Sequence, residues 1–330
     1  MFNEENSIEI KNLTKTYGSN KVLKDISFNV KKGEILGFLG LNGAGKSTTM
    51  NIVTGCISPT EGSVCVCGYD VLTQPKLAKA RIGYLPENPP LYFDMTVYEY
   101  LVFVYELKKC KLPMKEHLAD IMERVKITHM SQRLIKNLSK GYKQRVGLAQ
   151  AMVGEPDILI LDEPTVGLDP KQIIEIRSLI RSLGKEHTVI LSTHILQEVS
   201  AVCDRVAIIA QGRIVAQNTI SGLEEESYDK DELTLTVLST EESVKDILLN
   251  CNCLEQIVKV KTNDDKTQKF IIKQKSGTDI RHELGKLLAD NHITIGELKC
   301  SAPTLEEIFI KYASMTDSEP VEEDEVKEDA

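Results

Sequence analysis

The stretch that decides the fold of this chain reads Gly40-Leu41-Asn42-Gly43-Ala44-Gly45-Lys46-Ser47. It matches the pattern G-x-x-x-x-G-K-[ST], follows an apolar run at residues 35–39, and opens a segment expected to be helical from about Lys46 toward Val53. Glycines let a backbone wrap closely around an anion, while loop N–H groups and a helix N-terminus supply fixed positive potential. Lys46 adds a mobile charge and Ser47 a hydroxyl that can ligate Mg²⁺. The stretch therefore predicts a loop that cradles the β- and γ-phosphates of a nucleotide.

Four apolar residues followed by two carboxylates form a second motif, at residues 158–163. The apolar part is expected to be a strand buried on both faces. Its C-terminal end would deliver Asp162 to the ligand shell of Mg²⁺ and place Glu163 beside the γ-phosphate, where a carboxylate orients or deprotonates water. A strand ending in two acids is by itself more often a solvated turn. The catalytic interpretation depends on the phosphate-binding stretch upstream.

The pattern up to about Leu223 indicates an α/β fold, that of a P-loop NTPase. Short apolar runs, at residues 35–39, 158–161 and 189–191, alternate with helix-like stretches. Such runs fit a sheet whose strands are covered on both faces. Between Glu87 and Gly154 apolar residues recur at three- and four-residue spacing, which predicts a helical insert.

A different pattern begins after residue 226. Strand, helix, strand, strand, helix and strand are expected in turn, the order of a small α+β, ferredoxin-like unit. The expected ranges are 233–238, 243–250, 257–261, 269–273, 279–290 and 293–298, with a final helix from Thr304. The predicted domains are therefore a nucleotide-binding domain at 1–222 with its insert at about 87–154, a small domain at 223–313, and a disordered acidic tail at 314–330, too charged to fold alone.

Composition narrows the function classes. No apolar run approaches the ~20 residues that span a bilayer, so a soluble protein is expected whose membrane role, if any, needs a partner. The acidic start of the chain does not resemble a secretory signal, and the eight cysteines are not set in metal-binding pairs, so reduced thiols are expected. Most of the net charge of −9 lies in the acidic tail. The body therefore offers no general electrostatic attraction for nucleic acid, and none is expected as a partner.

Between the two motifs lies a stretch that resembles the LSGGQ signature of ABC ATPases. It reads Leu138-Ser139-Lys140-Gly141-Tyr142-Lys143-Gln144-Arg145. Ser139 and Gly141 are retained, whereas Lys140 and Tyr142 depart from the commonest form. In that family the loop reaches the γ-phosphate held by the other protomer. Without the family, Ser139 fits two interpretations equally: the cap of a helix, or part of an N–H cluster that binds an anion.

Other positions strengthen the resemblance, which runs densely from Ile8 to about Gln217. It implies that Tyr17 stacks on adenine, that residues 167–170 contact the partner subunit, and that His194 contacts the γ-phosphate. A strand-end tyrosine or a lone histidine is ordinarily structural, so these two roles come from the resemblance alone. Glu87 stands where the family usually has glutamine. A carboxylate still offers an oxygen to Mg²⁺, but it adds charge beside phosphates and cannot donate as an amide does.

The resemblance implies the ATP-binding, ATP-hydrolysing subunit of a bacterial ABC transporter. One copy would supply Tyr17, Gly40, Leu41, Asn42, Gly43, Ala44, Gly45, Lys46, Ser47, Thr48, Asp162, Glu163 and His194, and the other Ser139 and Gly141, with Ser47, Glu87 and Asp162 as the Mg²⁺ ligands. Two Mg-ATP molecules would close this homodimer, and hydrolysis would release it. Closure would drive an integral-membrane permease gripped near the helical insert and Glu87, on the cytoplasmic face of the inner membrane. Residues 86–92 and 305–309 resemble ABC-2 exporters, and more narrowly the gliding-motility-associated branch.

Two competing functions remain at this point. The first is a soluble ABC ATPase of translation or DNA repair, which usually carries two nucleotide-binding domains in tandem or long coiled coils. Neither an internal repeat nor sustained heptads occur in this sequence. The second is a nucleotide-gated binding module that does not hydrolyse ATP. The intact Lys46, Asp162 and Glu163 argue against it.

Overall fold

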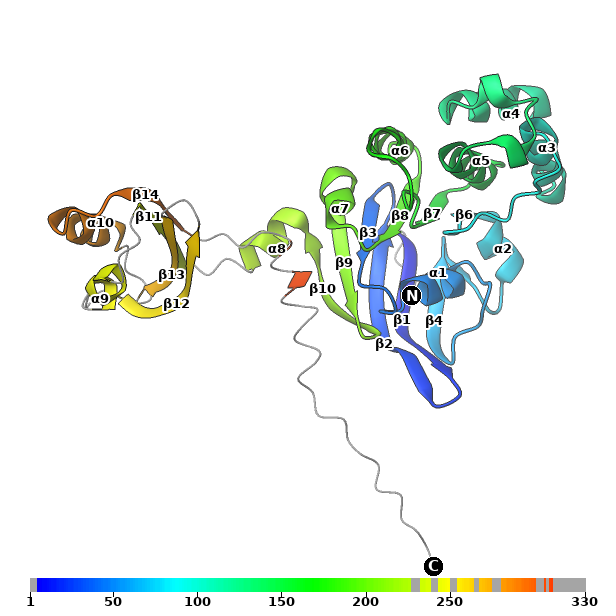
Figure 1. Cartoon of the computed structure of the whole chain (residues 1–330). Coiled ribbons are helices and arrows are strands. Elements are labelled where there is room, and N and C mark those ends of the chain that lie inside the picture. The colour runs from blue at the N-terminus through cyan, green and yellow to red at the C-terminus, as the bar shows by residue number, and fades with distance from the viewer. Residues whose placement is uncertain are drawn as a thin grey trace, which may run out of the picture. The chain divides into compact units, whose positions relative to one another are not determined.

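The chain divides into two compact units in this computed structural model (Figure 1). The structure describes residues 5–226, 232–238, 243–249, 254–263, 267–274, 280–300, 306 and 309–310. The first unit runs to Ile220 and also takes in Phe309, and the second spans Ser221–Ile308. The division falls close to the boundary expected at residue 222, but Phe309 groups with the first unit rather than the second. The expected acidic tail, and most of the helix expected from Thr304, lie outside the described residues.

A six-stranded sheet forms the centre of the first unit, in the order β10-β9-β3-β8-β7-β6. The strands are β3 (Ile35–Leu39), β6 (Ile82–Leu85), β7 (Ile158–Asp162), β8 (Thr188–Thr193), β9 (Arg205–Ala210) and β10 (Arg213–Thr219). All are parallel except β10, which pairs antiparallel with β9 at the edge. Every residue of β3, β7 and β8 is buried, which explains their continuous apolar runs. Loops that follow the carboxyl ends of these parallel strands meet at one edge of the sheet.

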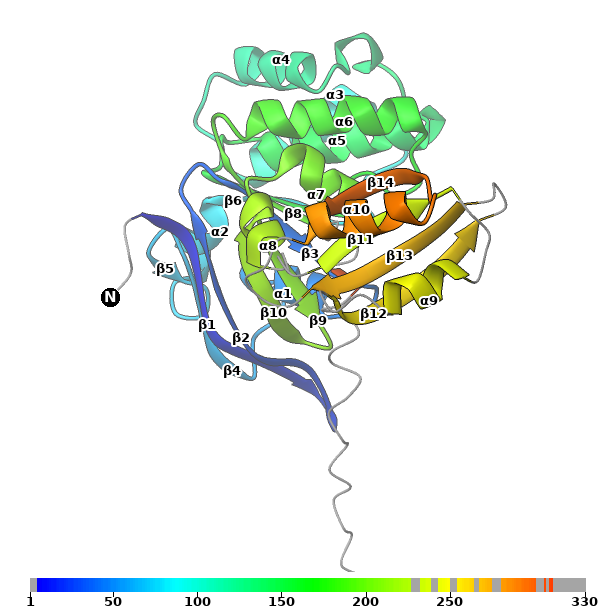
Figure 2. The same cartoon turned by 90° about the vertical axis from the view of Figure 1, so that its left-hand side faces the viewer.

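The helices of this unit cover both faces of the sheet (Figures 1 and 2). They are α1 (Lys46–Val53), α2 (Pro75–Ala80), α6 (Pro170–Leu183) and α7 (Leu196–Val202). Helix α8 (Ile220–Glu226) begins where this stretch of the unit ends, and its residues from Ser221 onward belong to the second unit. On one face, Phe38 of β3 belongs to the core that also contains Met50 of α1. On the other, α7 lies so close to β3 that a Cβ on Gly37 would sit 2.9 Å from Val199 Cγ1. The glycine therefore permits close helix–sheet packing.

A second, antiparallel sheet packs on the first, and the sequence analysis did not predict it. Its strands are β1 (Asn6–Tyr17), β2 (Asn20–Lys31), β4 (Glu61–Val66) and β5 (Tyr69–Asp70), in the order β2-β1-β4-β5. The rings of Phe28 and Phe38 stack across the two sheets with centroids 5.1 Å apart. The pairing of β1 with β2 contains several register shifts, which break the regular alternation that would otherwise mark two strands.

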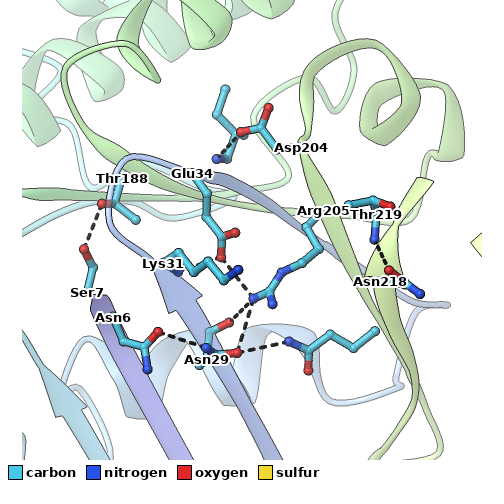
Figure 3. A network of polar contacts seen from close by, with 12 residues as sticks. Asn6, Ser7, Asn29, Lys31, Glu34, Thr188, Asp204, Arg205, Asn218 and Thr219 are labelled. Carbon is cyan, nitrogen blue, oxygen red and sulfur yellow. Dashed lines mark hydrogen bonds and ion pairs between the residues drawn. The ribbon is translucent and has the colours of Figure 1, made fainter. Parts of the chain in front are cut away.

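A network of polar contacts links β1 and β2 of the second sheet to β8 and β9 of the first (Figure 3). Arg205 on β9 donates from Nη2 to the Asn29 carbonyl of β2 at 2.5 Å and to Glu34 Oε1 at 3.0 Å. The hydroxyls of Ser7 and Thr188 lie 2.9 Å apart. The hydrogen bonds of Arg205 are charge-assisted and have restricted geometry, so together with the Ser7–Thr188 pair they fix one sheet against the other.

The expected helical insert is present at one end of the sheet. It comprises α3 (Val97–Leu107), α4 (Met114–Arg124), α5 (Lys140–Met152) and the short 3₁₀ turns at Thr128–Met130 and Ile135–Asn137. Helix α3 begins with a capping box in which Thr96 and Glu99 bond each other's backbone N–H groups. Helix α5 packs against β6, and thereby attaches the insert to the sheet.

The second unit is a four-stranded antiparallel sheet with two helices. Its elements are β11 (Glu232–Val237), α9 (Ser243–Leu249), β12 (Leu254–Asn263), β13 (Thr267–Gln274), α10 (Arg281–Asp290) and β14 (Ile295–Cys300). The strand order β12-β13-β11-β14 is that of a ferredoxin-like unit, as the element order predicted. Its core includes Leu235, Leu248, Phe270 and Leu284. Within the described residues of both units, no helix has the length and apolar character needed to cross a membrane.

Candidate functional site

The phosphate-binding stretch forms the turn between β3 and α1, as its sequence requires. Gly43 and Gly45 adopt positive φ angles of 83° and 110°, which a residue with a side chain rarely adopts. Gly40 meets a different constraint, since a Cβ there would lie 2.5 Å from the Ile209 carbonyl oxygen. The glycines are therefore needed to shape this turn.

Lys46 folds back over its own loop and is only 6% exposed. Its Nζ donates to the carbonyl oxygens of Gly40 at 2.8 Å and Leu41 at 3.3 Å. It also lies 3.5 Å from Glu163 Oε1. A positive charge is thus held at the mouth of the loop and opposite a carboxylate.

A cavity of about 470 Å³ opens over this loop. Its lining is Val22, Asn42, Gly43, Gly45, Lys46, Ser47, Thr48, Glu87, Glu163, Val166 and His194. The structure thus brings together nine of the residues singled out from the sequence, drawn from the phosphate loop, the Glu87 segment and the loops after β7 and β8. Val22 and Val166 were missed, because isolated valines carry no motif. The volume lies in the range of ~300–1,000 Å³ found for small-molecule sites.

A carboxylate and an imidazole face each other in this cavity. His194 Nδ1 lies 2.9 Å from Glu163 Oε1 and 3.0 Å from Oε2. Glu163 adopts a positive φ of 50°, and its N–H donates to the Ser192 carbonyl at 2.9 Å. A non-glycine residue in this region is strained and persists only where its surroundings fix it. The arrangement can orient a water molecule and accept its proton.

Asp162 ends β7, directly before Glu163 of the cavity lining, and is 2% exposed. Burial raises its pKa, while the nearby hydroxyls of Ser192 and Ser47 act in the opposite direction. Its Oδ1 atom is buried without a hydrogen-bond partner. Such an atom is rare unless a ligand satisfies it. Carboxylate and hydroxyl oxygens are the donors that Mg²⁺ prefers, so Asp162 and Ser47 fit that ion.

Tyr17 does not line the cavity. It lies at the end of β1 with 49% of its surface exposed, and Lys15 Nζ sits 4.9 Å from its ring centroid. Gly40, Leu41, Ala44 and Asp162 are likewise absent from the lining, the last because it is buried beneath it.

The signature loop lies apart from the cavity. Ser139 is the N-cap residue of α5 and makes no side-chain capping hydrogen bond. A Cβ on Gly141 would lie 2.5 Å from Gln172 Oε1, so the glycine lets the amide end of this side chain approach the start of α5. Gly141 lines a separate pocket of about 380 Å³ with Tyr142 and other residues, and no residue of 138–145 lines the phosphate cavity. One copy of the chain therefore does not bring its signature loop to its own phosphate loop.

Comparison with known proteins bears on the same residues. Residues 23–166 match the family described as ABC transporter. The chain is 35% identical over 306 residues to the bacitracin transport ATP-binding protein BcrA of Bacillus licheniformis, covering 92% of this chain and 96% of that protein.

Two solved structures are also similar. A structure titled ATP binding subunit of ABC transporter shares 32% identity with a TM-score of 0.61, covering 66% of this chain and 92% of the other. A dimeric post-hydrolysis state of the ATP-binding cassette MJ0796, bound to ADP and Pi, shares 26% identity with a TM-score of 0.59, covering 64% and 98%. The motifs, the cavity and these similarities agree: the chain belongs to the ABC transporter family and is an ATP-binding, ATP-hydrolysing subunit of such a transporter.

Proposed function

We propose that two copies of this chain enclose two Mg-ATP molecules, each held by the phosphate loop of one copy and the signature loop of the other. The observation that carries this proposal is the separation within one copy. The phosphate loop, Glu163 and His194 share one cavity, whereas Gly141 lines another pocket. The similar cassette bound to ADP and Pi is described as dimeric, which supports the same assembly.

Each residue of the cavity has a defined role in this proposal. Lys46 exchanges its loop carbonyls for the β- and γ-phosphate oxygens, to which the N–H groups of residues 43–48 also donate. Glu163 orients the attacking water and accepts its proton, while His194 holds the carboxylate and contacts the γ-phosphate. Ser47 and the unpaired oxygen of Asp162 would hold Mg²⁺, with Glu87 at the rim. When bound, that ion neutralises phosphate charge in the transition state.

Tyr17 supports the adenine in this arrangement. It is half exposed at the end of β1, so part of its aromatic surface is accessible to a base. From the second copy, Ser139 and the backbone N–H of Gly141 would meet the γ-phosphate at the start of α5.

The partner we propose is an integral-membrane permease of the ABC-2 exporter type, which would place the subunit on the cytoplasmic face of the membrane. Two neighbouring aromatics between β6 and α3, Tyr92 and Phe93, are 53% and 51% exposed. The rings of Tyr92 and Phe103 of α3 form a T-shaped pair with centroids 5.2 Å apart, and Lys143 Nζ lies 5.2 Å from the centroid of Phe93, so each aromatic has a packing partner. Exposed aromatics beside a rigid helix are typical of protein-binding surfaces. The narrower assignment to the gliding-motility-associated branch rests on residues 86–92 and 305–309 alone.

Closure of the dimer supplies the direct test. Glu163→Gln keeps the shape of the site and its ability to bind ATP but removes the base, so a closed dimer should accumulate with ATP and Mg²⁺ and not with ADP. Light scattering would follow the shift from monomer to dimer. Adding Ser139→Arg places a bulky cation at the proposed cross-subunit contact and should prevent that shift while ATP binding persists. Equal dimerisation of the single and double variants would show that Ser139 has no such role.

Attachment to a permease can be tested separately. A chain carrying Tyr92→Ser and Phe93→Ser should lose a multispanning partner on purification from detergent-solubilised membranes. Leu107→Ser is the matched control, because Leu107 is 68% exposed at the other end of α3. Retention of the partner by the double variant would place the permease elsewhere.

A further inference from the structure

A buried carboxylate outside the cavity joins the two loops that carry Glu163 and His194. Glu198 of α7 is 0% exposed and does not line the cavity. Removing an ionised carboxylate from water costs several kcal/mol unless hydrogen bonds and opposite charge replace the water. A carboxylate retained in such a place therefore needs partners, and those partners indicate what it holds.

Glu198 receives one threonine hydroxyl on each of its two oxygens. Thr165 donates to Oε1, and Thr193 donates to Oε2 at 2.8 Å. Both threonines are buried, at 2% and 0% exposure. Arg177 of α6 places Nη2 3.9 Å from Oε1 and supplies positive charge nearby. The carboxylate is thus fully engaged, and its contacts lead to two different loops.

The positions of these threonines connect Glu198 to the reacting groups. Thr165 lies two residues after Glu163 in the loop that follows β7, and Thr193 ends β8 directly before His194. Thr193 Oγ1 also accepts from the Ile195 N–H at 3.0 Å, so it fixes the backbone on both sides of the histidine. Glu163 needs such support because of its positive φ.

We infer that Glu198 is a positioning residue for hydrolysis, which sets the separation of Glu163 and His194 by holding the two loops to one rigid carboxylate. It acts through Thr165 and Thr193 and touches no nucleotide. The inference rests on the proposed roles of Glu163 and His194. A shift of about 1 Å in a reacting group can lower a rate by about 100-fold, whereas binding contacts made by other residues are unaffected. Loss of the junction should therefore lower kcat and leave the KM for ATP nearly unchanged.

Isosteric variants of the full-length chain test this without opening a cavity. Thr193→Val removes the hydroxyl and should lower kcat by about tenfold or more, with KM within about twofold. Thr193→Ser keeps the hydroxyl and should restore kcat. Thr188→Val is the matched control, since Thr188 is a buried hydrogen-bonded threonine at the other end of β8. An unchanged kcat in Thr193→Val, or an equal loss in Thr188→Val, would overturn the inference.

A double-variant cycle separates positioning from general stability. Glu198→Gln should lower the rate of single-turnover hydrolysis in the wild-type chain. In the Glu163→Gln background it should leave the residual rate unchanged, because both residues act on the same step. Additive losses would mean that Glu198 only stabilises the fold. If Glu198→Gln does not fold, Thr165→Val takes its place in the cycle with the same expected pattern. Full activity of Glu163→Gln would overturn the proposed function and this role together, whereas an inactive Glu163→Gln beside a fully active Glu198→Gln would overturn the inference alone.

Discussion

The phosphate loop and the signature loop share a plan and differ in completeness. Each stands at the start of a helix, α1 or α5, and each has a glycine in close contact, Gly40 with the backbone of Ile209 and Gly141 with the side chain of Gln172. Around the phosphate loop, however, a lysine, a carboxylate and an imidazole converge in one cavity. The signature loop opens on a pocket of its own. The difference supports our proposal that one copy holds most of an ATPase site and that the signature loop of a second copy completes it.

The largest effect is expected at the completed half. Lys46→Ala removes the mobile charge for the β- and γ-phosphates and leaves Glu163 without its nearest cation. ATP binding should weaken, and kcat/KM should fall by at least about 100-fold. An ATPase assay measures this, with Lys76→Ala on exposed α2 as the control. Wild-type turnover in Lys46→Ala would remove our assignment of the site.

A smaller effect is expected at Gly141 of the signature loop, which we propose contacts the nucleotide held by the other copy. Gly141→Ala would place a Cβ against the side-chain amide of Gln172, which would have to move aside, on the surface that we propose meets the γ-phosphate of the other copy. The expected result is a loss of ATPase activity of about tenfold with unchanged ATP affinity of the monomer, measured by calorimetry in the Glu163→Gln background. Gly285→Ala, where the added Cβ meets nothing within 4 Å, should be silent. If Gly141→Ala weakened binding to the monomer, the two loops would not be separate half-sites.

Glu87 at the rim of the cavity should show a still smaller effect. Glu87→Gln removes one negative charge beside the bound phosphates and restores a donor. Because Glu87 is exposed, solvent screens the gain, and the affinity for Mg-ATP should rise by only about twofold to fivefold. Titration at low and high salt would check this, since the gain should shrink as salt is added. A lower affinity would mean that the carboxylate is needed as an oxygen donor.

The smallest effect is expected on removal of the second unit. This unit has its own core, and we propose that it is a separable domain. A chain ending after Ile220 should therefore bind ATP with wild-type affinity within about twofold, because no residue of the phosphate cavity is lost. Fluorescent ATP binding and thermal unfolding would be compared with the full chain. Failure to fold would show that the two units depend on each other.

Motifs with local causes were predictable. The turn at 40–47 is specified by its own glycines and by the strand before it, and β7 by four apolar residues in a row. The helical insert and the ferredoxin-like order followed from periodicity. These features depend on neighbours in sequence, which a single sequence displays.

Features that depend on distant contacts were not predictable. The sheet of β1 and β2 is irregular in register, so its alternation is broken. Glu198 lies in a short helix, where an acidic residue would be predicted to face solvent. Its burial is explained by the hydrogen bonds from Thr165 and Thr193, which come from other parts of the fold. Val22 reaches the cavity from the antiparallel sheet, which the sequence analysis did not foresee. The role that we propose for the signature loop needs a second copy of the chain, and the sequence analysis reached it only through the family resemblance.

The resting position of Lys46 has a thermodynamic consequence. Its ammonium already contacts two carbonyl oxygens and the Glu163 carboxylate. The phosphates of a nucleotide must therefore compete with these groups for Lys46. The free energy of ATP binding then includes the difference between the contacts that Lys46 makes with the phosphates and those it gives up with the carbonyls and Glu163. Glu163→Gln removes the negative charge that competes with phosphate for Lys46, so this variant should bind ATP more tightly than the wild type even as a monomer.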